Sequence, residues 1–298
     1  MRTRRTIAVA LAVIALTATA ACGKEGSPNA EGGDSAAKLP TYAVKSDVKI
    51  ASKALEDAKK NGKLIIGAKS DQPFLGFEDT STGTRTGFDI EIAKMVAADL
   101  GFSPEQIDFK TINSANRETA LKDGQIHLYV GTYTINDERK KSVGFAGPYY
   151  VAGQDLLVQK TNSDITGKDS VKGKNICSAT GSTSVKRIKD LGGTTTEYDA
   201  YSLCVDKLLT GEVDGVTTDD AILKGFAAKN PNKLKVVGQP FSKEPYGVGM
   251  SKDDKALRDA VNDALKAHED NGDWKKAYDA TLGLSGAAAP EVPQLERY

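Results

Sequence analysis

Short apolar runs alternate with amphipathic stretches along most of this chain, and this alternation is the feature that most constrains its fold. The first clear apolar run is residues 64–66, and a final amphipathic segment covers residues 257–265. Strands that alternate with helices are typical of parallel sheets built from βαβ units. The chain is therefore predicted to be an α/β protein.

The expected elements follow from apolar periodicity and from capping residues. We expect strands at residues 64–66, 126–130, 155–159, 175–179, 214–218, 235–237 and 246–251. We expect helices capped by Asp89 and by Ser114, and helices at 182–191, 202–209, 220–229 and 257–265. They form two blocks without a long linker, which indicates two lobes with a ligand between them. Lobe one would be residues 45–153 plus 245–284, and lobe two residues 154–244.

The charge balance argues against a polyanionic partner. The 298 residues include 40 basic and 40 acidic side chains, so no net field attracts nucleic acid or anionic lipid. No nucleic-acid partner is expected.

The N-terminus resembles a secretory signal, expected to be residues 1–21. Three arginines in the first five residues precede an apolar run at 7–16, which is too short to span a bilayer. The run from Thr19 to Cys22 resembles a bacterial lipobox, although leucine commonly stands where Thr19 does. We expect acyl chains on Cys22 to anchor the exported protein to the outer face of the cell membrane. Otherwise Cys22 only ends a cleaved signal, and general or twin-arginine export both stay open.

Polar or proline-rich segments are expected at both ends of the folded part. Residues 22–44 are rich in Gly, Ser and Ala, which is typical of a flexible tether. The tail at 285–298 is rich in Ala and Pro and is expected to trail off.

Cys177 and Cys204 are the only cysteines after Cys22. An even pair in an exported protein predicts a disulfide, which contributes on the order of 3 kcal/mol. A metal or nucleophile role would need partners, and the only histidines are His127 and His268.

The stretch 131–150 contains the first candidate site. Thr132 and Thr134 follow an expected strand, and Arg139 lies one turn further on. Ligands bind at strand ends in open α/β sheets, and a guanidinium beside hydroxyls suits a carboxylate. The alternative is a solvent-facing arginine in the charged loop 137–141.

Motifs in both blocks resemble one known family. They are GAKSDQP (67–73), GFD (87–89), residues 132–139, residues 145–149 and GST (181–183). Together they resemble the polar amino-acid-binding proteins of ABC importers, the extracellular solute-binding family 3, over residues 62–284. KSDQP, NRET, CSATGST and the paired cysteines are most similar to the glutamate-binding lipoproteins of Gram-positive bacteria.

The resemblance implies a two-lobed, periplasmic-binding-protein-like fold of type II with the ligand cleft between lobes that hinge shut. It implies a monomer without cofactor or metal, not an enzyme, whose partners are an amino acid and the importer's permease and ATPase subunits. In lobe one, Arg139 with Thr132 and Thr134 corresponds to the clamp on the α-carboxylate.

Lobe two would close over the ligand. Ser182 and Thr183 open an expected helix, whose N-terminus attracts an anion, and Asp219 matches the acceptor for the ammonium group. The alternative for Ser182 is a simple N-cap. Of Asp219 and Asp220, one is expected to cap a helix and the other to bind.

Specificity is expected to rest on Lys69 and Arg117. Arg117 lies in the first turn of a helix, where the dipole disfavours a cation, so it needs an anionic partner. The alternatives are a salt bridge from Arg117 to Glu118 or Asp108, and a solvated Lys69.

The charge count then favours an acidic amino acid, because an unpaired buried charge is costly. We expect L-glutamate, with aspartate, glutamine or asparagine as alternatives. A sensing receptor or a dehydratase-like enzyme on the same fold also stays open.

Overall fold

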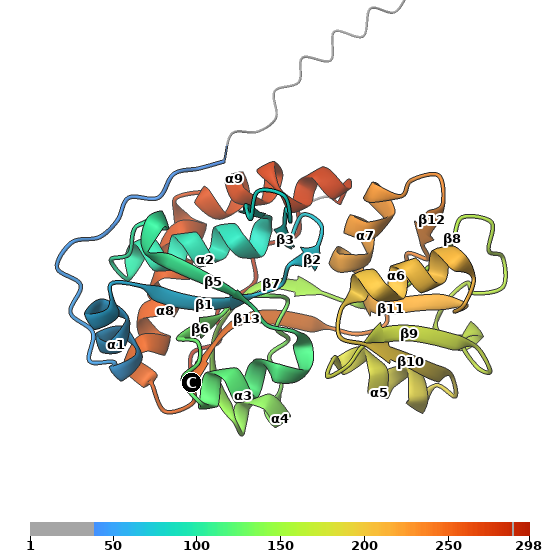
Figure 1. Ribbon diagram of the computed structural model, residues 1–298, viewed down its shortest axis with the longest axis horizontal. Helices are drawn as coiled ribbons and strands as arrows, with labels where there is room; N and C mark the ends of the chain where they lie inside the picture. Colours follow the sequence, from blue (N-terminus) through green and yellow to red (C-terminus); the bar gives the residue numbers. More distant parts are fainter. Residues whose placement is uncertain (1–38, 288) are drawn as a thin grey trace, which may run out of the picture. The chain divides into compact units, whose positions relative to one another are not determined.

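The computed structural model describes residues 39–287 and 289–298, and two five-stranded sheets form its framework (Figure 1). In the first sheet the strands lie in the order β5 (Ile107–Thr111), β1 (Leu64–Ala68), β6 (Leu128–Tyr129), β13 (Glu244–Ser251) and β7 (Val143–Ala152). In the second the order is β10 (Thr194–Tyr198), β9 (Asn175–Ala179), β11 (Gly215–Asp219), β8 (Gln154–Gln159) and β12 (Leu234–Val236). A small antiparallel sheet contains β2 (Asp71–Gln72), β3 (Gly76–Glu78) and β4 (Arg85–Thr86).

Both large sheets are mixed, so the expectation of parallel sheets is wrong in part. β1 pairs in parallel with β5 and β6, and β9 pairs in parallel with β10 and β11. β13 is antiparallel to β6 and β7, and β8 is antiparallel to β11 and β12. Parallel neighbours need a crossover connection, whereas β7 leads into β8, and β12 into β13, without an intervening helix. These strands carry the chain from one sheet to the other.

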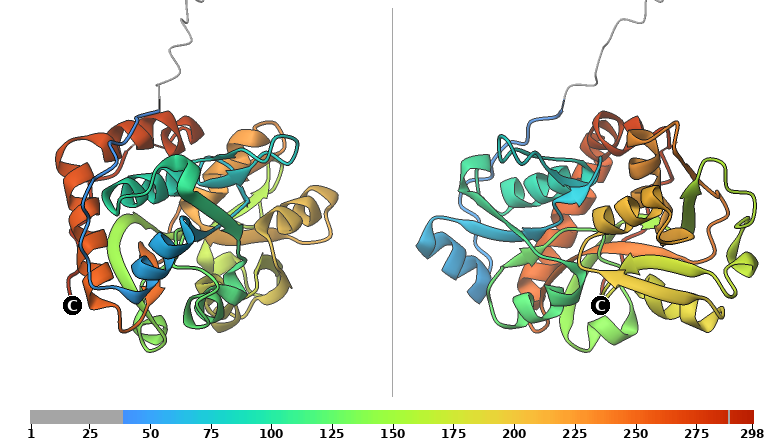
Figure 2. Two further views of the ribbon diagram at one scale, coloured as in Figure 1. Left: turned by 60° about the vertical axis from the view of Figure 1, so that its left-hand side comes forward. Right: turned by 45° about the vertical axis from the view of Figure 1, so that its right-hand side comes forward.

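Helices cover both faces of each large sheet (Figures 1 and 2). On the first sheet, one face holds α2 (Phe88–Asp99), α8 (Lys255–Asp270) and α9 (Asp273–Ala280), and the other holds α3 (Arg117–Lys122) and α4 (Asp137–Lys140). On the second sheet, one face holds α6 (Tyr201–Thr210) and α7 (Asp220–Lys229), and the other holds α5 (Thr183–Asp190). Outside these layers are α1 (Lys53–Asn61) and 3₁₀ helices at Pro104–Gln106, Ser114–Asn116, Lys168–Ser170 and Leu282–Ser285.

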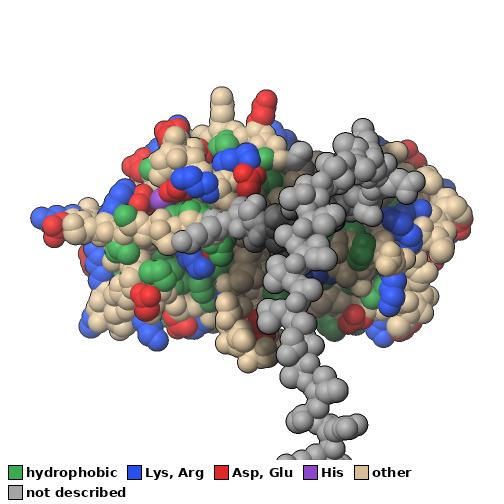
Figure 3. Space-filling model, turned by 90° about the horizontal axis from the view of Figure 1, so that it is seen from above, with side chains coloured by type: hydrophobic (Ala, Val, Ile, Leu, Met, Phe, Trp, Pro, Cys, Tyr) green, Lys and Arg blue, Asp and Glu red, His purple; other side chains and the backbone are tan. Residues whose placement is uncertain are grey.

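Among residues 39–287 and 289–298, no helix is both long enough and apolar enough to cross a bilayer. On the face seen in Figure 3, basic and acidic side chains are interspersed where grey atoms do not cover the surface. This mixture agrees with the equal numbers of basic and acidic residues.

Asp89 and Ser114 do not cap helices, so both of those predictions are wrong. The N-cap of α2 is Gly87, and Asp89 is fully buried one position inside the helix. Ser114 opens a short 3₁₀ helix, and α3 follows it. Both side chains have other partners: the Asp89 carboxylate accepts from Tyr149 Oη, and Ser114 Oγ accepts from Lys69 Nζ.

The ends of the described chain are held more firmly than predicted. Tyr42, in the expected tether, donates its hydroxyl to Glu91, so the packed part begins before residue 45. The tail does not trail off, because the Glu296 N–H donates to the Gly147 carbonyl and the Phe145 N–H to the Tyr298 hydroxyl. The predicted signal peptide and Cys22 lie outside the described residues.

For the lobe boundaries we propose the division predicted from the sequence. β7 ends at Ala152 and β8 begins at Gln154, which supports a first crossing at Gly153. The second crossing would lie at the start of β13, between Glu244 and Pro245. Lobe one and lobe two keep these meanings below.

Candidate ligand-binding site

A tight, nearly filled cavity lies where side chains from the two lobes meet. Seven of the eight predicted ligand-binding residues line it: Arg117, Thr132, Thr134, Arg139, Ser182, Thr183 and Asp219. The eighth, Lys69, lies behind Ser114, which does line the cavity. Ser114, Tyr201 and Thr218 were not among the predicted ligand contacts. A small cavity with many convergent polar groups suits a compact, highly polar ligand.

Arg139 lies at the wall of this cavity and not in solvent. Its side chain comes from α4, is 9% exposed, and donates from Nη1 to the Thr134 carbonyl at 2.8 Å. Glu118 lies 3.4 Å from Nε. Burial, with a contribution from Arg117, lowers the pKa of Arg139 to about 10, so the guanidinium stays charged at neutral pH. A charged, rigidly held guanidinium beside two hydroxyls can grip a carboxylate.

Thr132 adopts a strained backbone conformation at the same wall. Its φ of 47° lies in the left-handed region, which β-branched residues rarely adopt. The Thr132 N–H donates to the buried carboxylate of Asp89 at 3.1 Å, and its hydroxyl contacts the Gln72 amide. Burial raises the pKa of Asp89 to about 6. Strain held by buried partners is characteristic of ligand-binding loops.

Lys69 and Arg117 form a cationic pair joined by Ser114. Lys69 Nζ donates to Ser114 Oγ at 2.8 Å, and Arg117 Nε donates to the Ser114 carbonyl at 3.1 Å. They are only 3% and 2% exposed. Among the described residues, no carboxylate oxygen lies within 4.0 Å of either cationic group. Burial first, and then Arg117, lowers the pKa of Lys69 to about 7.

The structure does not contain the alternative arrangements expected for Arg117 and Lys69, a salt bridge and a solvated side chain. Glu118 pairs with Arg139 and not with Arg117. The Arg117 guanidinium lies over the Tyr133 ring, 4.3 Å from its centroid, which provides a cation–π contact. Lys69 is buried and therefore not solvated.

From lobe two, Ser182 and Thr183 at the start of α5 and Asp219 just before α7 line the cavity. Ser182 holds the N-cap position of α5, but its hydroxyl contacts Ser178 Oγ and makes no capping bond. The helix N–H groups near Ser182 and Thr183 can therefore meet an anion.

Asp219 precedes α7 and also makes no capping bond. Its Oδ2 accepts from the Tyr246 hydroxyl at 2.7 Å, and its Oδ1 has no hydrogen-bond partner among the described residues. Burial, and then Glu244, raises the pKa of Asp219 to about 7. Asp220 accepts from the Gly153 N–H, so neither aspartate caps α7 with its side chain.

Glu244 is a buried acid that the sequence reasoning missed. One of its oxygens accepts from Thr134 of lobe one and from Thr183 of lobe two, each at 2.9 Å. Arg187 lies 3.0 Å from its other oxygen. In the sequence, Glu244 can be recognised only as a glutamate at the start of an expected strand. Many exposed glutamates fit the same description.

Gly181 brings the two lobes into direct contact beside the cavity. Its carbonyl accepts from Arg117 Nη2 at 3.4 Å and from Arg139 Nη2 at 3.3 Å. Its φ is 77°, and a Cβ there would lie 2.7 Å from Ala115 Cα, so both conformation and space require glycine.

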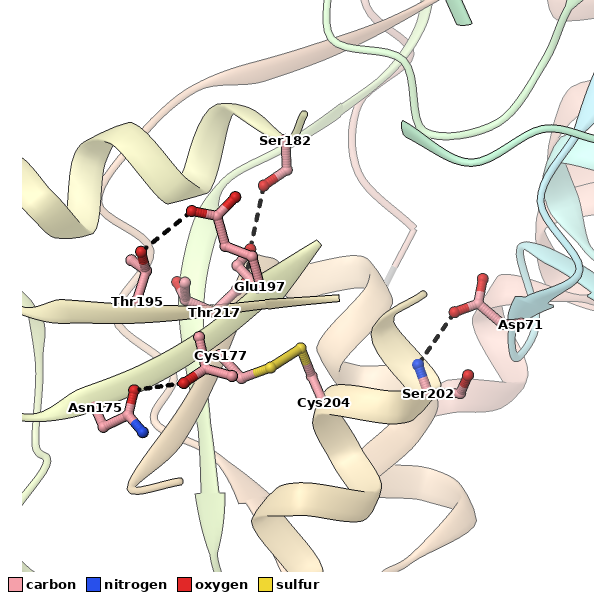
Figure 4. The surroundings of a disulfide bond; sticks show 11 residues. Asp71, Asn175, Cys177, Ser182, Thr195, Glu197, Ser202, Cys204 and Thr217 are labelled. Carbon is pink, nitrogen blue, oxygen red and sulfur yellow. Dashed lines mark hydrogen bonds between the residues drawn. A yellow bond between two sulfur atoms is a disulfide. The ribbon is translucent and has the colours of Figure 1, made fainter. Parts of the chain in front are cut away.

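The predicted disulfide is present in lobe two. It joins Cys177 of β9 to Cys204 of α6 across a sequence separation of 27 (Figure 4). Both cysteines are fully buried. The bond fixes α6, whose first residue, Tyr201, lines the cavity.

Comparison with known proteins finds relatives that match most of the chain. The chain is 36% identical over 303 residues to a glutamate-binding protein of Corynebacterium efficiens, covering 98% of this chain and 95% of that one. It is 38% identical over 248 residues to a glutamine-binding protein of Geobacillus stearothermophilus, covering 82% and 91%.

Among solved structures, an ancestral arginine-binding protein bound to glutamine superposes with a TM-score of 0.70 at 36% identity, covering 74% of this chain and 98% of that one. An ancestral amino-acid-binding protein described as a precursor of cyclohexadienyl dehydratase gives 0.70 at 28% identity, covering 78% and 100%. These neighbours share the two-lobed type II fold. The family model for bacterial extracellular solute-binding proteins, family 3, matches residues 64–283, and the chain belongs to that family.

Proposed function

We propose that this protein is the extracellular receptor of an ABC importer and that it captures L-glutamate. The relatives named above bind glutamate or glutamine, which supports an amino-acid ligand. Arg139, Thr132 and Thr134 would hold the α-carboxylate, and Asp219 would accept from the ammonium group. The lobes would hinge shut over the ligand through the crossing strands. A permease and an ATPase would be its partners.

The observation that carries glutamate over glutamine is the pair Lys69 and Arg117. Both are buried, and among the described residues neither has a carboxylate within 4.0 Å. Arg139 and Arg187 already have carboxylate partners, Glu118 and Glu244. Among the cavity-lining residues and Lys69, the remaining balance is therefore two cations against Asp219. Asp71 and Asp89 act on Lys69 from outside the cavity lining. Zwitterionic glutamate with its extra carboxylate supplies the missing negative charge, and neutral glutamine does not.

We also propose export and lipid anchoring at Cys22, with the folded part acting as a monomer at the outer face of the membrane. The family is one of extracellular proteins, which supports export. Only the N-terminal sequence pattern supports the lipid.

A binding role is proposed in preference to an enzymatic one. One structural neighbour is described as a precursor of a dehydratase, so an enzyme on this fold is the main competitor. Neither histidine lines the cavity: His127 accepts from the Ile65 N–H, and His268 contacts Asp273. Incubation with prephenate-like acids, followed by chromatography, should give no product.

Calorimetry of the purified protein against all the common amino acids tests the ligand. L-glutamate should bind more tightly than glutamine, and lysine, arginine and histidine should bind weakly or not at all. A preference for glutamine or for a basic amino acid would overturn the charge argument.

A further inference from the structure

Asp71 makes a hydrogen bond from lobe one to lobe two outside the cavity. It lies on β2, and its carboxylate accepts from the Ser202 backbone N–H of α6 at 3.1 Å. Figure 4 shows Asp71 reaching toward Ser202 in the first turn of this helix, two residues before the disulfide cysteine Cys204. Asp71 does not line the ligand cavity.

The N-terminus of α6 has no cap of its own. Its N-cap residue is Ala200, whose extended backbone (φ −130°, ψ 145°) suits a capping residue but whose side chain cannot accept a hydrogen bond. The first turn also contains no acidic residue. Asp71 therefore supplies both the acceptor and the negative charge that a helix N-terminus favours.

The loop that follows Asp71 also touches lobe two. A Cβ at Gly225 of α7 would lie 2.5 Å from the Pro73 carbonyl oxygen, so this helix approaches the loop closely. Lys229 Nζ lies 5.2 Å from the centroid of the Phe74 ring, and Phe74 has a φ of 67°. Residues 71–74 of lobe one thus contact two helices of lobe two.

We infer that Asp71 is a closing residue: it caps α6 from the other lobe and so stabilises the closed form for any ligand that the cavity accepts. The cap can exist only while the lobes are together, because donor and acceptor belong to different lobes. This inference rests on the proposed hinged binding of an amino acid. It assigns Asp71 a positioning role and no contact with the ligand.

Asp71 also lies near Lys69 and raises the pKa of that amine. Asp71 could affect binding through this charge or through lobe closure, and these two roles predict opposite results. If Asp71 acted only through charge, Asp71→Ala would make the site more positive and strengthen glutamate binding. If it closes the lobes, the variant should weaken glutamate and glutamine alike.

The test compares the effect of Asp71→Ala in the parent protein with its effect in the Ala200→Ser variant. Ala200→Ser gives α6 a capping residue of its own. Calorimetry should show that Asp71→Ala weakens both ligands by about tenfold. Small-angle X-ray scattering should show a larger radius of gyration at equal ligand saturation. In the Ala200→Ser background the same substitution should cost less than about threefold, because the serine hydroxyl accepts from the free N–H.

Three outcomes would overturn the inference: unchanged affinities, tighter glutamate binding, or an equal loss in both backgrounds. If the parent protein bound no amino acid, the proposed function would fail. Ligand-free scattering would then still test the closing role where the parent has the radius of gyration of the closed form described here: loss of the cap in Asp71→Ala should enlarge it, and no change would contradict the role.

Discussion

Arg117→Met should separate glutamate from glutamine. The guanidinium is 2% exposed and lies over Tyr133, so methionine keeps an apolar side chain on that ring and removes the charge. Removing one member of a buried charge pair costs about 2–5 kcal/mol. Because each 1.36 kcal/mol is a factor of ten, glutamate affinity should fall roughly thirtyfold to several thousandfold.

Glutamine should lose much less, because its side chain carries no charge. Arg117 also donates to the Gly181 carbonyl across the lobes, and losing that contact weakens both ligands equally. The decisive quantity is therefore the ratio of the two dissociation constants, measured by calorimetry.

A matched control is Arg258→Met. Arg258 is 9% exposed and lies over the Tyr298 ring at 4.3 Å, but it is not part of the cavity lining. This variant should leave the ratio unchanged. If Arg117→Met reduced both affinities by the same factor, Arg117 would have only a structural role, and the case for glutamate would fail.

Two further predictions concern stability. Burial lowers the pKa of Lys69 to about 7 from 10.5, so its contribution to the stability of the ligand-free protein is complete above pH 10.5 and is lost as pH falls through 7. Lys69→Met should therefore raise the free energy of unfolding at pH 7 by up to about 5 kcal/mol. It should also reduce the increase in the free energy of unfolding between pH 7 and pH 10. If urea unfolding showed the same pH profile for the variant and the parent, this reasoning would be wrong. Replacing Cys177 and Cys204 by serine should lower the free energy of unfolding by about 3.5 kcal/mol for a loop of this length, and a reductant should then have no further effect.

The cavity residues were predictable where a motif and a strand end coincide. Thr132 and Ser182 follow strands of the α/β pattern, and Asp219 ends one. Arg139 lies on the short helix α4 after β6. Strand ends converge at one edge of a sheet. Such residues can be placed without knowing how the two lobes pack.

Contacts that depend on the lobes meeting could not be predicted in this way. Glu244 shares one oxygen between Thr134 and Thr183, which are 49 residues apart, and no local pattern distinguishes it from a solvated glutamate. Asp71 and Ser202 are separated by 131 residues. The caps assigned to Asp89 and Ser114 were wrong because tertiary partners, Tyr149 and Lys69, took those side chains.

The position of β13 has a consequence for the order in which the protein folds. The second large sheet draws all its strands from one continuous stretch, residues 154–236, so it can form as soon as that stretch is available. The first sheet cannot, because β13 lies between β6 and β7, and its partners precede it by about a hundred residues. We therefore expect the inserted lobe to fold early and the lobe that carries Lys69, Arg117 and Arg139 to fold last.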